Sequence, residues 1–298
     1  MTRLGAASYG CLALGLFFGA ASDAHPERPV VERGGWRVLQ ADFHMHSRYS
    51  DGFLSPPELV MQASRRGLDV IAVTEHNMLF PARLARWWSE LTGGPTVLLG
   101  EEVTTRDWHL HAIGIDERVS PMQTLREAIA DIHRQGGLAI AAHPVRRFWK
   151  AFVPVISELD GAELMHPIAM RPNQSSRGDW SGAHLAEFFA LAEARGKRLT
   201  AIGSSDYHFG SALGRPRTFV LAKSAATVDV MDALRAGRTV VRVADGTLRG
   251  DPAAVALLEA DPVMAVDADY GNALTGWADV LGRALGLLGL AGLLVFRR

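Results

Sequence analysis

Cysteine is nearly absent from this sequence. Cys11 is the only cysteine among 298 residues, and it lies in an N-terminal apolar run. The body of the chain can therefore form neither a disulfide nor a thiolate metal site, so any metal must be bound through His, Asp and Glu. A cysteine nucleophile is excluded there for the same reason.

An excess of charge of either sign is also missing. The sequence has 31 Lys and Arg against 32 Asp and Glu, which gives a formal net charge of -1. Such a chain has no overall field that would attract nucleic acid or an acidic membrane surface. We therefore expect no stable nucleic-acid partner, and any anion recognition has to come from local groups.

The first apolar run is typical of a secretory signal. Residues 1–24 contain Arg3, then a stretch rich in Leu and Phe, then small residues at Ser22 and Ala24, the positions that a signal peptidase reads. The sequence predicts a signal peptide over residues 1–24. A buried N-terminal helix is the alternative.

A second apolar run closes the sequence. Residues 277–298 are rich in Leu, Gly and Ala and end in two arginines, and their length is close to the roughly 20 residues of a bilayer-spanning helix. We predict a transmembrane helix or a sorting tail here, with an amphipathic helix packed on the domain as the alternative, and a spacer at residues 250–276. The body would then be secreted across the inner membrane to the periplasmic or extracellular face and be tethered to the membrane by its C-terminal helix.

Between residues 36 and 249, short apolar runs alternate with helical patterns, which is typical of a parallel sheet wrapped by helices. Strands are predicted at residues 39–44, 70–74, 96–99, 110–114, 138–142, 162–165, 201–204, 218–222 and 239–243, and helices at 56–66, 81–92, 124–135, 182–194 and 228–236. This rhythm favours one α/β domain of barrel type. The carboxyl ends of barrel strands meet on one face, where active sites are built.

Histidines and carboxylates fall at the ends of these predicted strands. His44 and His46 are two residues apart on a strand, so their imidazoles project from the same side and can bind one ion together. Asp51 lies in a turn that can bring its carboxylate back over the strand end. The candidate metal ligands are His44, His46, Asp51, His76, Glu102, His109, His111, His143, Asp206 and His208. They exceed what one ion needs and favour a site for two or three divalent ions, in which Glu102 and Asp206 can act as bridges.

The order of these residues resembles that of the PHP (polymerase and histidinol phosphatase) metallohydrolases. The motifs that carry the resemblance are Asp42-Phe-His44-Met-His46 continuing to Asp51-Gly52, Thr74-Glu75-His76-Asn77, Gly100-Glu101-Glu102-Val103 with His109-Leu-His111, Ala142-His143-Pro144, and Ser205-Asp206-Tyr-His208. The resemblance implies a distorted (β/α)7 barrel and a trinuclear site that uses Mn, Fe or Zn. It also implies three ligand groups: His44, His46, Glu102 and Asp206; Glu102, His143 and either His109 or His111; and Asp51, His76 and His208.

Some positions depart from the family pattern or leave it open. Glu75 stands where the family more often has Asp. Spacing does not decide between His109 and His111, and the histidine that is not a ligand would support the site or contact the substrate. Glu102 is preferred over its neighbour Glu101, because the family pattern is Gly, any residue, Glu.

Other polar residues match no motif. Glu163 lies at a strand end and can support the site. Four histidines are interpreted as solvent-facing or structural: His25, His133, His166 and His184.

The expected nucleophile is a water activated by the ions, since the sequence has no Ser-His-Asp order. Arg215 and Arg217 are the candidate catalytic groups that would hold the charge of a phosphoester, because planar guanidinium groups bind phosphate oxygens in bidentate fashion. A second basic cluster, with a solvated patch as its alternative interpretation, consists of Arg146, Arg147 and Lys150. We predict a phosphoesterase that acts on a small-molecule or nucleotide phosphoester. The alternatives are a carboxylester, carbamate or amide hydrolase with the same metal ligands, and a non-catalytic metal-bearing binding module.

Overall fold

The structure, a computed structural model, describes residues 3–23, 30–170, 180–209, 213–259 and 273–295. The chain divides into two units, one formed by residues 1–29 with 267–298 and the other by residues 30–266. Each unit is described by itself.

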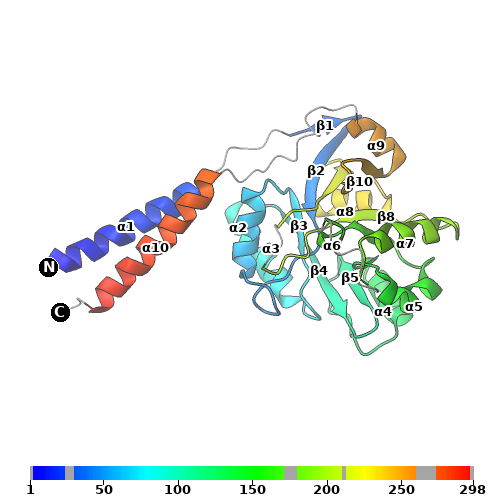
Figure 1. Ribbon diagram of the computed structural model, residues 1–298, viewed down its shortest axis with the longest axis horizontal. Coiled ribbons are helices and arrows are strands. Elements are labelled where there is room, and N and C mark those ends of the chain that lie inside the picture. Colours follow the sequence, from blue (N-terminus) through cyan, green and yellow to red (C-terminus); the bar gives the residue numbers. More distant parts are fainter. Residues whose placement is uncertain (1–2, 24–29, 171–179, 210–212, 260–272, 296–298) are drawn as a thin grey trace. The chain divides into compact units, whose positions relative to one another are not determined.

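The larger unit is built on one strongly curved sheet (Figure 1). Its strands are β1 (Glu32–Arg33), β2 (Trp36–Asp42), β3 (Val70–Val73), β4 (Thr96–Thr104), β5 (His109–Ile113), β6 (Leu138–Ala141), β7 (Gly161–Met165), β8 (Thr200–Gly203), β9 (Thr218–Ala222), β10 (Thr239–Arg242) and β11 (Leu248–Gly250). The strand order is β11-β10-β9-β2-β3-β4-β5-β6-β7-β8, and β1 pairs with β2. The hydroxyl of Thr218 on β9 hydrogen-bonds both the N–H and the carbonyl of Gly203 on β8, so the sheet is a nearly closed barrel.

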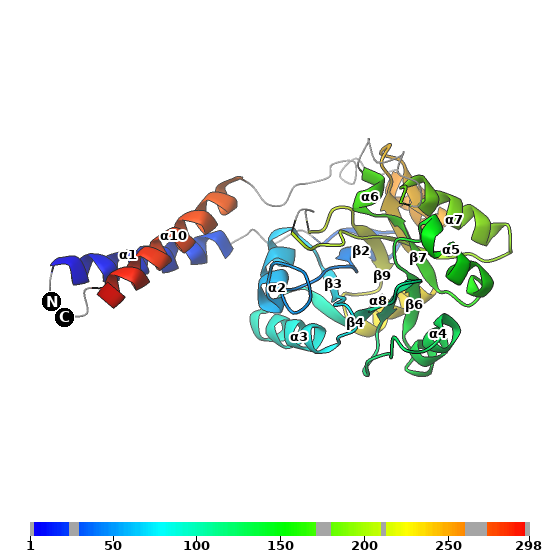
Figure 2. The same cartoon turned by 60° about the horizontal axis from the view of Figure 1, so that its bottom comes forward.

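Helices surround this barrel (Figure 2). They are α2 (Pro56–Arg65), α3 (Phe80–Thr92), α4 (Leu125–Arg134), α5 (Arg146–Phe152), α6 (Pro167–Met170), α7 (Ala183–Glu193), α8 (Thr227–Arg235) and α9 (Pro252–Glu259), with a 3-10 turn at Val153–Val155. Capping boxes begin α2 at Ser55 and α4 at Thr124, and α3 ends at Gly93 with a left-handed φ of 69°. These are the start and stop signals that the sequence carries.

One end of the barrel is closed by α8. Its buried side chains Val230, Met231 and Leu234 join the inward-facing residues of the strands in one apolar cluster. The helix lies at the amino ends of β8 and β4, because the hydroxyl of Thr200, the first residue of β8, donates to the Leu234 carbonyl at 2.9 Å. The hydroxyl of Thr96, the first residue of β4, donates to the Ala225 carbonyl just before α8 at 2.6 Å. The opposite end of the barrel is left to polar residues.

The predicted α/β barrel is confirmed, and every strand predicted between residues 39 and 243 is present. The sheet is mixed rather than parallel, however, since β5 runs antiparallel to both β4 and β6, and β9 runs antiparallel to both β2 and β10. Only residues 105–108 join β4 to β5, which is too short for a parallel crossover of a dozen or more residues. The predicted spacer at 250–276 is also corrected in part, because α9 buries Ala254 and Leu258 on the domain.

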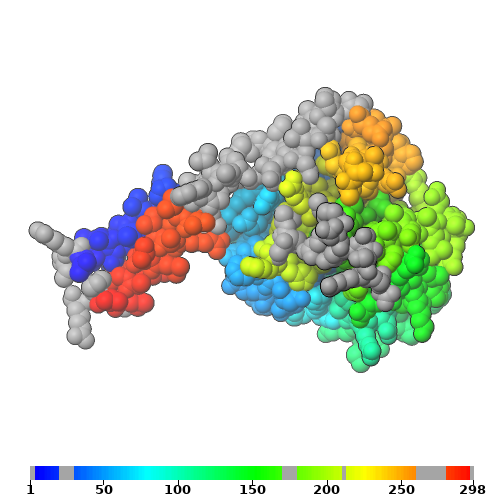
Figure 3. Space-filling model, viewed as in Figure 1, coloured from blue at the N-terminus to red at the C-terminus, as the bar shows by residue number. Residues whose placement is uncertain are grey.

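The terminal unit consists of α1 (Arg3–Asp23) and α10 (Ala273–Val295), which lie against each other in the space-filling view (Figure 3). They approach closely at glycines, since a Cβ placed on Gly15 would lie 2.8 Å from the backbone nitrogen of Gly286. Among the residues described, no helix combines the length and the apolar character needed to cross a membrane. The bilayer-spanning helix at 277–298 is therefore not supported, whereas the signal peptide and the secretion remain predictions.

Candidate metal centre

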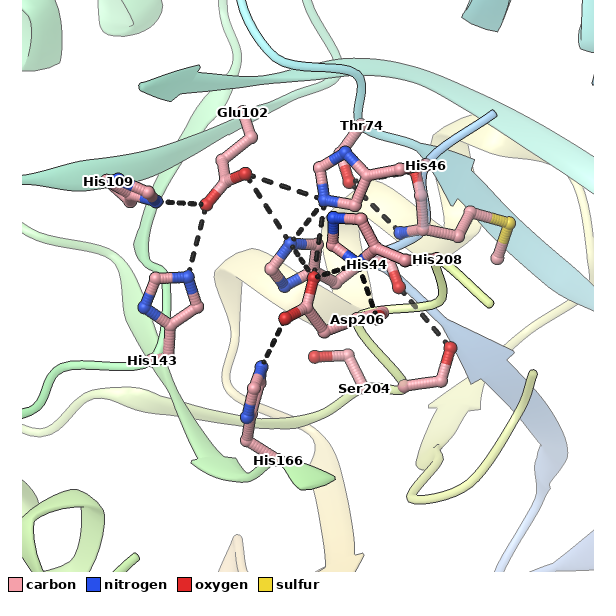
Figure 4. A network of polar contacts seen from close by, with 12 residues as sticks. His44, His46, Thr74, Glu102, His109, His143, His166, Ser204, Asp206 and His208 are labelled. Atoms are coloured by element: carbon pink, nitrogen blue, oxygen red, sulfur yellow. Dashed lines mark hydrogen bonds and ion pairs between the residues drawn. The ribbon is translucent and has the colours of Figure 1, made fainter. Parts of the chain in front are cut away.

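The candidate ligands gather at the end of the barrel opposite α8, and Figure 4 shows those around Glu102 and Asp206. His44, His76, His143 and Asp206 each follow the carboxyl end of a strand, namely β2, β3, β6 and β8. His109 is instead the first residue of β5, and the antiparallel hairpin brings it beside the carboxyl end of β4. One edge of the barrel therefore positions ligands from all of these strands.

The backbone is strained at this edge. The described non-glycine residues with positive φ are Asn77 (55°), His143 (25°) and Asp206 (45°), and all three lie in or beside the ligand cluster. Conformations of this kind cost on the order of 1–3 kcal/mol each and persist only where the surroundings impose them. The side chain of Asn77, for example, is held by the backbone N–H and carbonyl of Thr104 at 2.9 and 3.0 Å.

A first group of ligand atoms converges where His44 and His46 meet two carboxylates. The Nε2 atoms of the two imidazoles are 3.0 Å apart. Asp206 Oδ1 lies 3.0 and 3.3 Å from them, and Glu102 Oε2 lies 3.6 and 3.5 Å from them. The two imidazole nitrogens and Glu102 Oε2 therefore lie close enough together to hold one ion, and Asp206 Oδ1 lies beside both imidazoles.

A second group forms around the other oxygen of Glu102. Its Oε1 lies 2.9 Å from His109 Nδ1 and 3.3 Å from His143 Nε2. Glu102 thus has one oxygen in each group, which is the arrangement of a bridging carboxylate.

The hairpin register separates the positions of His109 and His111. The two histidines share a face of β5, but His111 pairs with Glu102 in the ladder and lies one step deeper in the barrel than His109. His111 is fully buried with its Nε2 3.4 Å from Glu163 Oε1, whereas His109 reaches the Glu102 carboxylate from the rim. His109 therefore belongs to the group around Glu102 Oε1, while His111 lies deeper, with His44 and Glu163.

A third group is more exposed and comes from loops. Asp51 Oδ2 lies 3.5 Å from His76 Nε2, and Asp51 Oδ1 lies 3.2 Å from His208 Nε2. The side chain of Asp51 is 55% exposed, while that of Glu102 is 1% exposed. His46 also comes within reach of this group, so the first and third groups adjoin.

The electrostatics suit divalent cations. Burial alone would raise the pKa of Glu102, but the His44 charge and hydrogen bonds from His109 and His143 hold it well below its usual value. Burial lowers the pKa of His46 to about 4, so this imidazole is neutral and can act as a ligand. The buried Oε2 of Glu102 lies 2.8 Å from His76 Nδ1, 3.5 Å from His46 Nε2 and 3.6 Å from His44 Nε2, so carboxylate and imidazole donors surround one position. The cluster of carboxylates and imidazoles therefore fits metal ions.

His44 differs from its neighbour His46 in its protonation. Burial alone would lower its pKa, but the surrounding carboxylates, Asp206 first among them, outweigh burial and raise the pKa well above its usual value. In the metal-free protein this imidazolium neutralises part of the carboxylate charge. Binding of a cation would replace that proton.

Comparison with known proteins agrees with this geometry. Residues 42–142 match the family model of the PHP domain. The chain contains a PHP domain. This confirms the resemblance to the PHP metallohydrolases that the sequence motifs indicate.

Known relatives cover parts of the chain. An uncharacterized protein of Methanocaldococcus jannaschii is 29% identical over 141 residues, which are 43% of this chain and 82% of that protein. An error-prone DNA polymerase of Mycobacterium tuberculosis is 46% identical over 66 residues, which are 21% of this chain but only 6% of the polymerase. The similarity to the polymerase is therefore confined to a small part of that protein.

A solved structure shares the fold. The crystal structure of a two-domain protein from Bacteroides vulgatus, described as containing a predicted PHP-like metal-dependent phosphoesterase, matches with a TM-score of 0.59 and 24% identity. The match covers 73% of this chain and 68% of that chain. At this identity it shows the fold of the PHP domain and nothing finer.

Sequence reasoning missed one residue of the PHP domain site and underestimated another. His166 was assigned to no site, yet its Nε2 lies 3.0 Å from Asp206 Oδ2 and its side chain lines the pocket at the cluster. It directly follows β7, so the strand-end signal that identified the other ligands was present. Glu163, given only a supporting role, is fully buried and contacts His44 and His143.

The two arginines predicted as catalytic do not line this pocket. Arg217 is buried, and its guanidinium donates to the Gly214 carbonyl at 2.9 Å and to the side-chain oxygen of Gln40. These contacts hold Arg217 in the packed core. The structure therefore holds Arg217 away from the ligands, whereas the role of Arg215 stays a prediction.

The remaining residues that the sequence assigned outside the site are structural where they are described. His133 pairs with Asp160 at 2.8 Å on the surface, and His184 accepts from the Arg146 backbone N–H at 3.3 Å. His25 lies outside the described residues. Glu101 faces away from the cluster and accepts from the backbone N–H of Val119.

Proposed function

We propose that this protein is a metal-dependent phosphoesterase that uses two or three divalent ions, Mn, Fe or Zn, at the open end of its PHP domain. The observation that carries the proposal is the convergence of three ligand groups, two of which share the carboxylate of Glu102. Ions bound there would lower the pKa of a water that attacks the substrate and would hold a substrate oxygen.

The side chains of this chain would orient that site. Glu102 would serve the first group through Oε2 and the second through Oε1. His166 contacts Oδ2 of Asp206 and leaves Oδ1 directed at His44 and His46.

The pocket wall supports an anionic substrate. The pocket of about 430 Å³ is lined by Trp180 as well as by the ligands, and the Arg147 guanidinium lies 5.9 Å from the Trp180 ring and 5.6 Å from the Phe148 ring. Arg146, in contrast, pairs with Glu187 at 2.8 Å. Arg147 forms no ion pair within the described part of the chain, and its guanidinium donates to the Arg106 carbonyl at 3.4 Å. It is not a lining residue of the pocket, but from its place beside Trp180 it would meet a phosphate group at the rim, where guanidinium is the preferred cation.

The proposal is tested on the full chain loaded with Mn²⁺. Chromogenic phosphomonoester, phosphodiester and carboxylester substrates are assayed with and without chelator, next to a His44→Ala/His46→Ala double variant. Phosphoester turnover that chelation and the double variant both abolish is the expected result. Turnover of the carboxylester alone would instead support a carboxylester, carbamate or amide hydrolase, and bound ions with no turnover would support a binding module.

A further inference from the structure

One buried carboxylate lies beneath two of the three ligand groups and touches both. Glu163 on β7 is fully buried. Its Oε1 accepts from His44 Nδ1 at 2.8 Å and from the hydroxyl of Ser204, and its Oε2 accepts from the backbone N–H of His143 at 2.5 Å. The carboxylate thus connects the residues that follow β2, β6 and β8.

We propose that Glu163 is a positioning residue that orients ligands of both the first and the second group, and that the third group does not depend on it. The inference rests on the proposed metal site. It follows from the two oxygens of the Glu163 carboxylate. Oε1 orients His44, a ligand of the first group, and Oε2 holds the backbone of His143, a ligand of the second group.

The contact with His44 fixes which ring nitrogen faces the cluster. Because Nδ1 donates to Glu163, Nε2 is the nitrogen directed at Asp206 and Glu102. A carboxylate in this place also makes a metal-binding imidazole more basic, and loss of such a partner typically weakens metal binding about 10- to 100-fold.

The contact with His143 holds a strained backbone. His143 has a φ of 25°, a conformation that side-chain-bearing residues rarely adopt. The hydrogen bond from its N–H to Glu163 favours this conformation, from which His143 Nε2 reaches Glu102. An amide at position 163 has only one acceptor oxygen, so it cannot accept from both His44 and His143.

The third group depends on a different carboxylate. Glu75 accepts from the backbone N–H of Ser47 at 2.5 Å and from the hydroxyl of Ser50. These contacts hold the loop that carries Asp51. Within the described residues, no hydrogen bond or ion pair joins Glu163 to Asp51, His76 or His208. Glu163 and Glu75 therefore support separate parts of the site.

The test counts ions in full-length variants. Wild type, Glu163→Gln, Glu75→Gln and Glu101→Gln are dialysed against Mn²⁺ over a range of concentrations and analysed for metal per chain. Glu101→Gln is the matched control, because Glu101 is equally buried but contacts Val119 and no ligand. We expect Glu163→Gln to weaken the ions of the first and second groups about 10- to 100-fold and to keep the third. Glu75→Gln should weaken the third alone.

The assignment of the retained ion is checked by adding His208→Ala to Glu163→Gln, which should remove it. Far-UV circular dichroism and thermal melting of the metal-free proteins establish that each variant folds. If Glu163→Gln does not fold, Glu163→Asp keeps the charge but is one methylene shorter, and it should bind the first two ions more weakly than wild type.

The outcomes separate this inference from the proposed function. Unchanged affinity for all ions in a folded Glu163→Gln or Glu163→Asp protein would overturn the inference while leaving the metal site intact. Uniform weakening of all three ions would also overturn it, since the third group would then not be independent. A wild-type chain that bound no Mn²⁺ would overturn the proposed function and the inference together.

Discussion

The two ends of the barrel bury different kinds of side chain. At the end closed by α8, Val230 and Leu234 are fully buried among apolar strand residues. At the other end, His44, Glu102 and Glu163 are also fully buried, although they are charged or polar. Burying apolar surface stabilises the fold, whereas burying charge is costly unless it is paired. The end closed by α8 therefore stabilises the fold, whereas holding buried ligands in place at the other end costs part of that free energy.

The largest effect of a substitution at the polar end is expected at Glu102, whose carboxylate is shared by two ligand groups. Glu102→Gln removes the charge that bridges two ligand groups, so phosphoester kcat/KM should fall by more than the roughly 100-fold upper figure for residues that only orient a ligand. The metal-free variant should melt within a few degrees of the metal-free wild type. Steady-state kinetics and calorimetry measure both quantities. A variant that retained full activity would show that Glu102 is not a ligand.

The opposite end should respond in the reverse way. Leu234→Ala leaves a cavity under the barrel and should reduce the free energy of unfolding by about 2–5 kcal/mol. Its metal content and its kcat at a temperature well below the melting point should equal those of wild type. Denaturant unfolding and metal analysis provide the readouts, and loss of ions from the folded variant would mean that the two ends are coupled.

Adjacent residues of β4 sharpen the comparison. Burial raises the pKa of Glu101 to about 7, above the value of about 4.3 for an unfolded chain. The folded state therefore binds this proton more tightly, and the stability it gives is lost as pH rises from about 4 through 7. The free energy of unfolding of Glu101→Gln, taken relative to that of wild type, should therefore increase by about 2 kcal/mol from pH 5 to pH 8. An equal difference at both pH values would show that Glu101 does not titrate in this range.

The smallest effect is expected at the rim of the pocket. Arg147→Ala should raise KM for a phosphoester about 5- to 10-fold, the size of one charge-assisted contact near the surface, with little change in kcat. Arg146→Ala is the matched control, because its guanidinium pairs with Glu187 instead. Equal KM values for the two variants would remove Arg147 from the substrate site.

The fold was predictable from the sequence because its strands are short apolar runs bounded by turns. What the pattern did not predict was direction, since an apolar strand looks the same in a parallel and in an antiparallel sheet. The link of residues 105–108 between β4 and β5 contained that information, because so short a connection permits only a hairpin.

The candidate site was predictable where chemistry and position coincide. Ligands such as His76 and Asp206 follow strand ends and match a motif, and the structure brings them together. The depth of His109 and His111 depends on a hairpin register that spacing alone does not fix. Glu163 acts through two hydrogen bonds that join segments distant in the sequence. Arg217 donates a hydrogen bond to the side chain of Gln40 in the core instead of facing the site. Such long-range contacts exist only once the barrel has closed.

The most direct test of the account is the number of Mn²⁺ ions bound per full-length chain, measured by elemental analysis after equilibrium dialysis. The ligand groups predict two or three ions in the wild type and fewer in Glu102→Gln, because its carboxylate belongs to two groups. A wild-type chain without bound ions, or a Glu102→Gln chain that holds as many as the wild type, would contradict a metal centre built around this carboxylate.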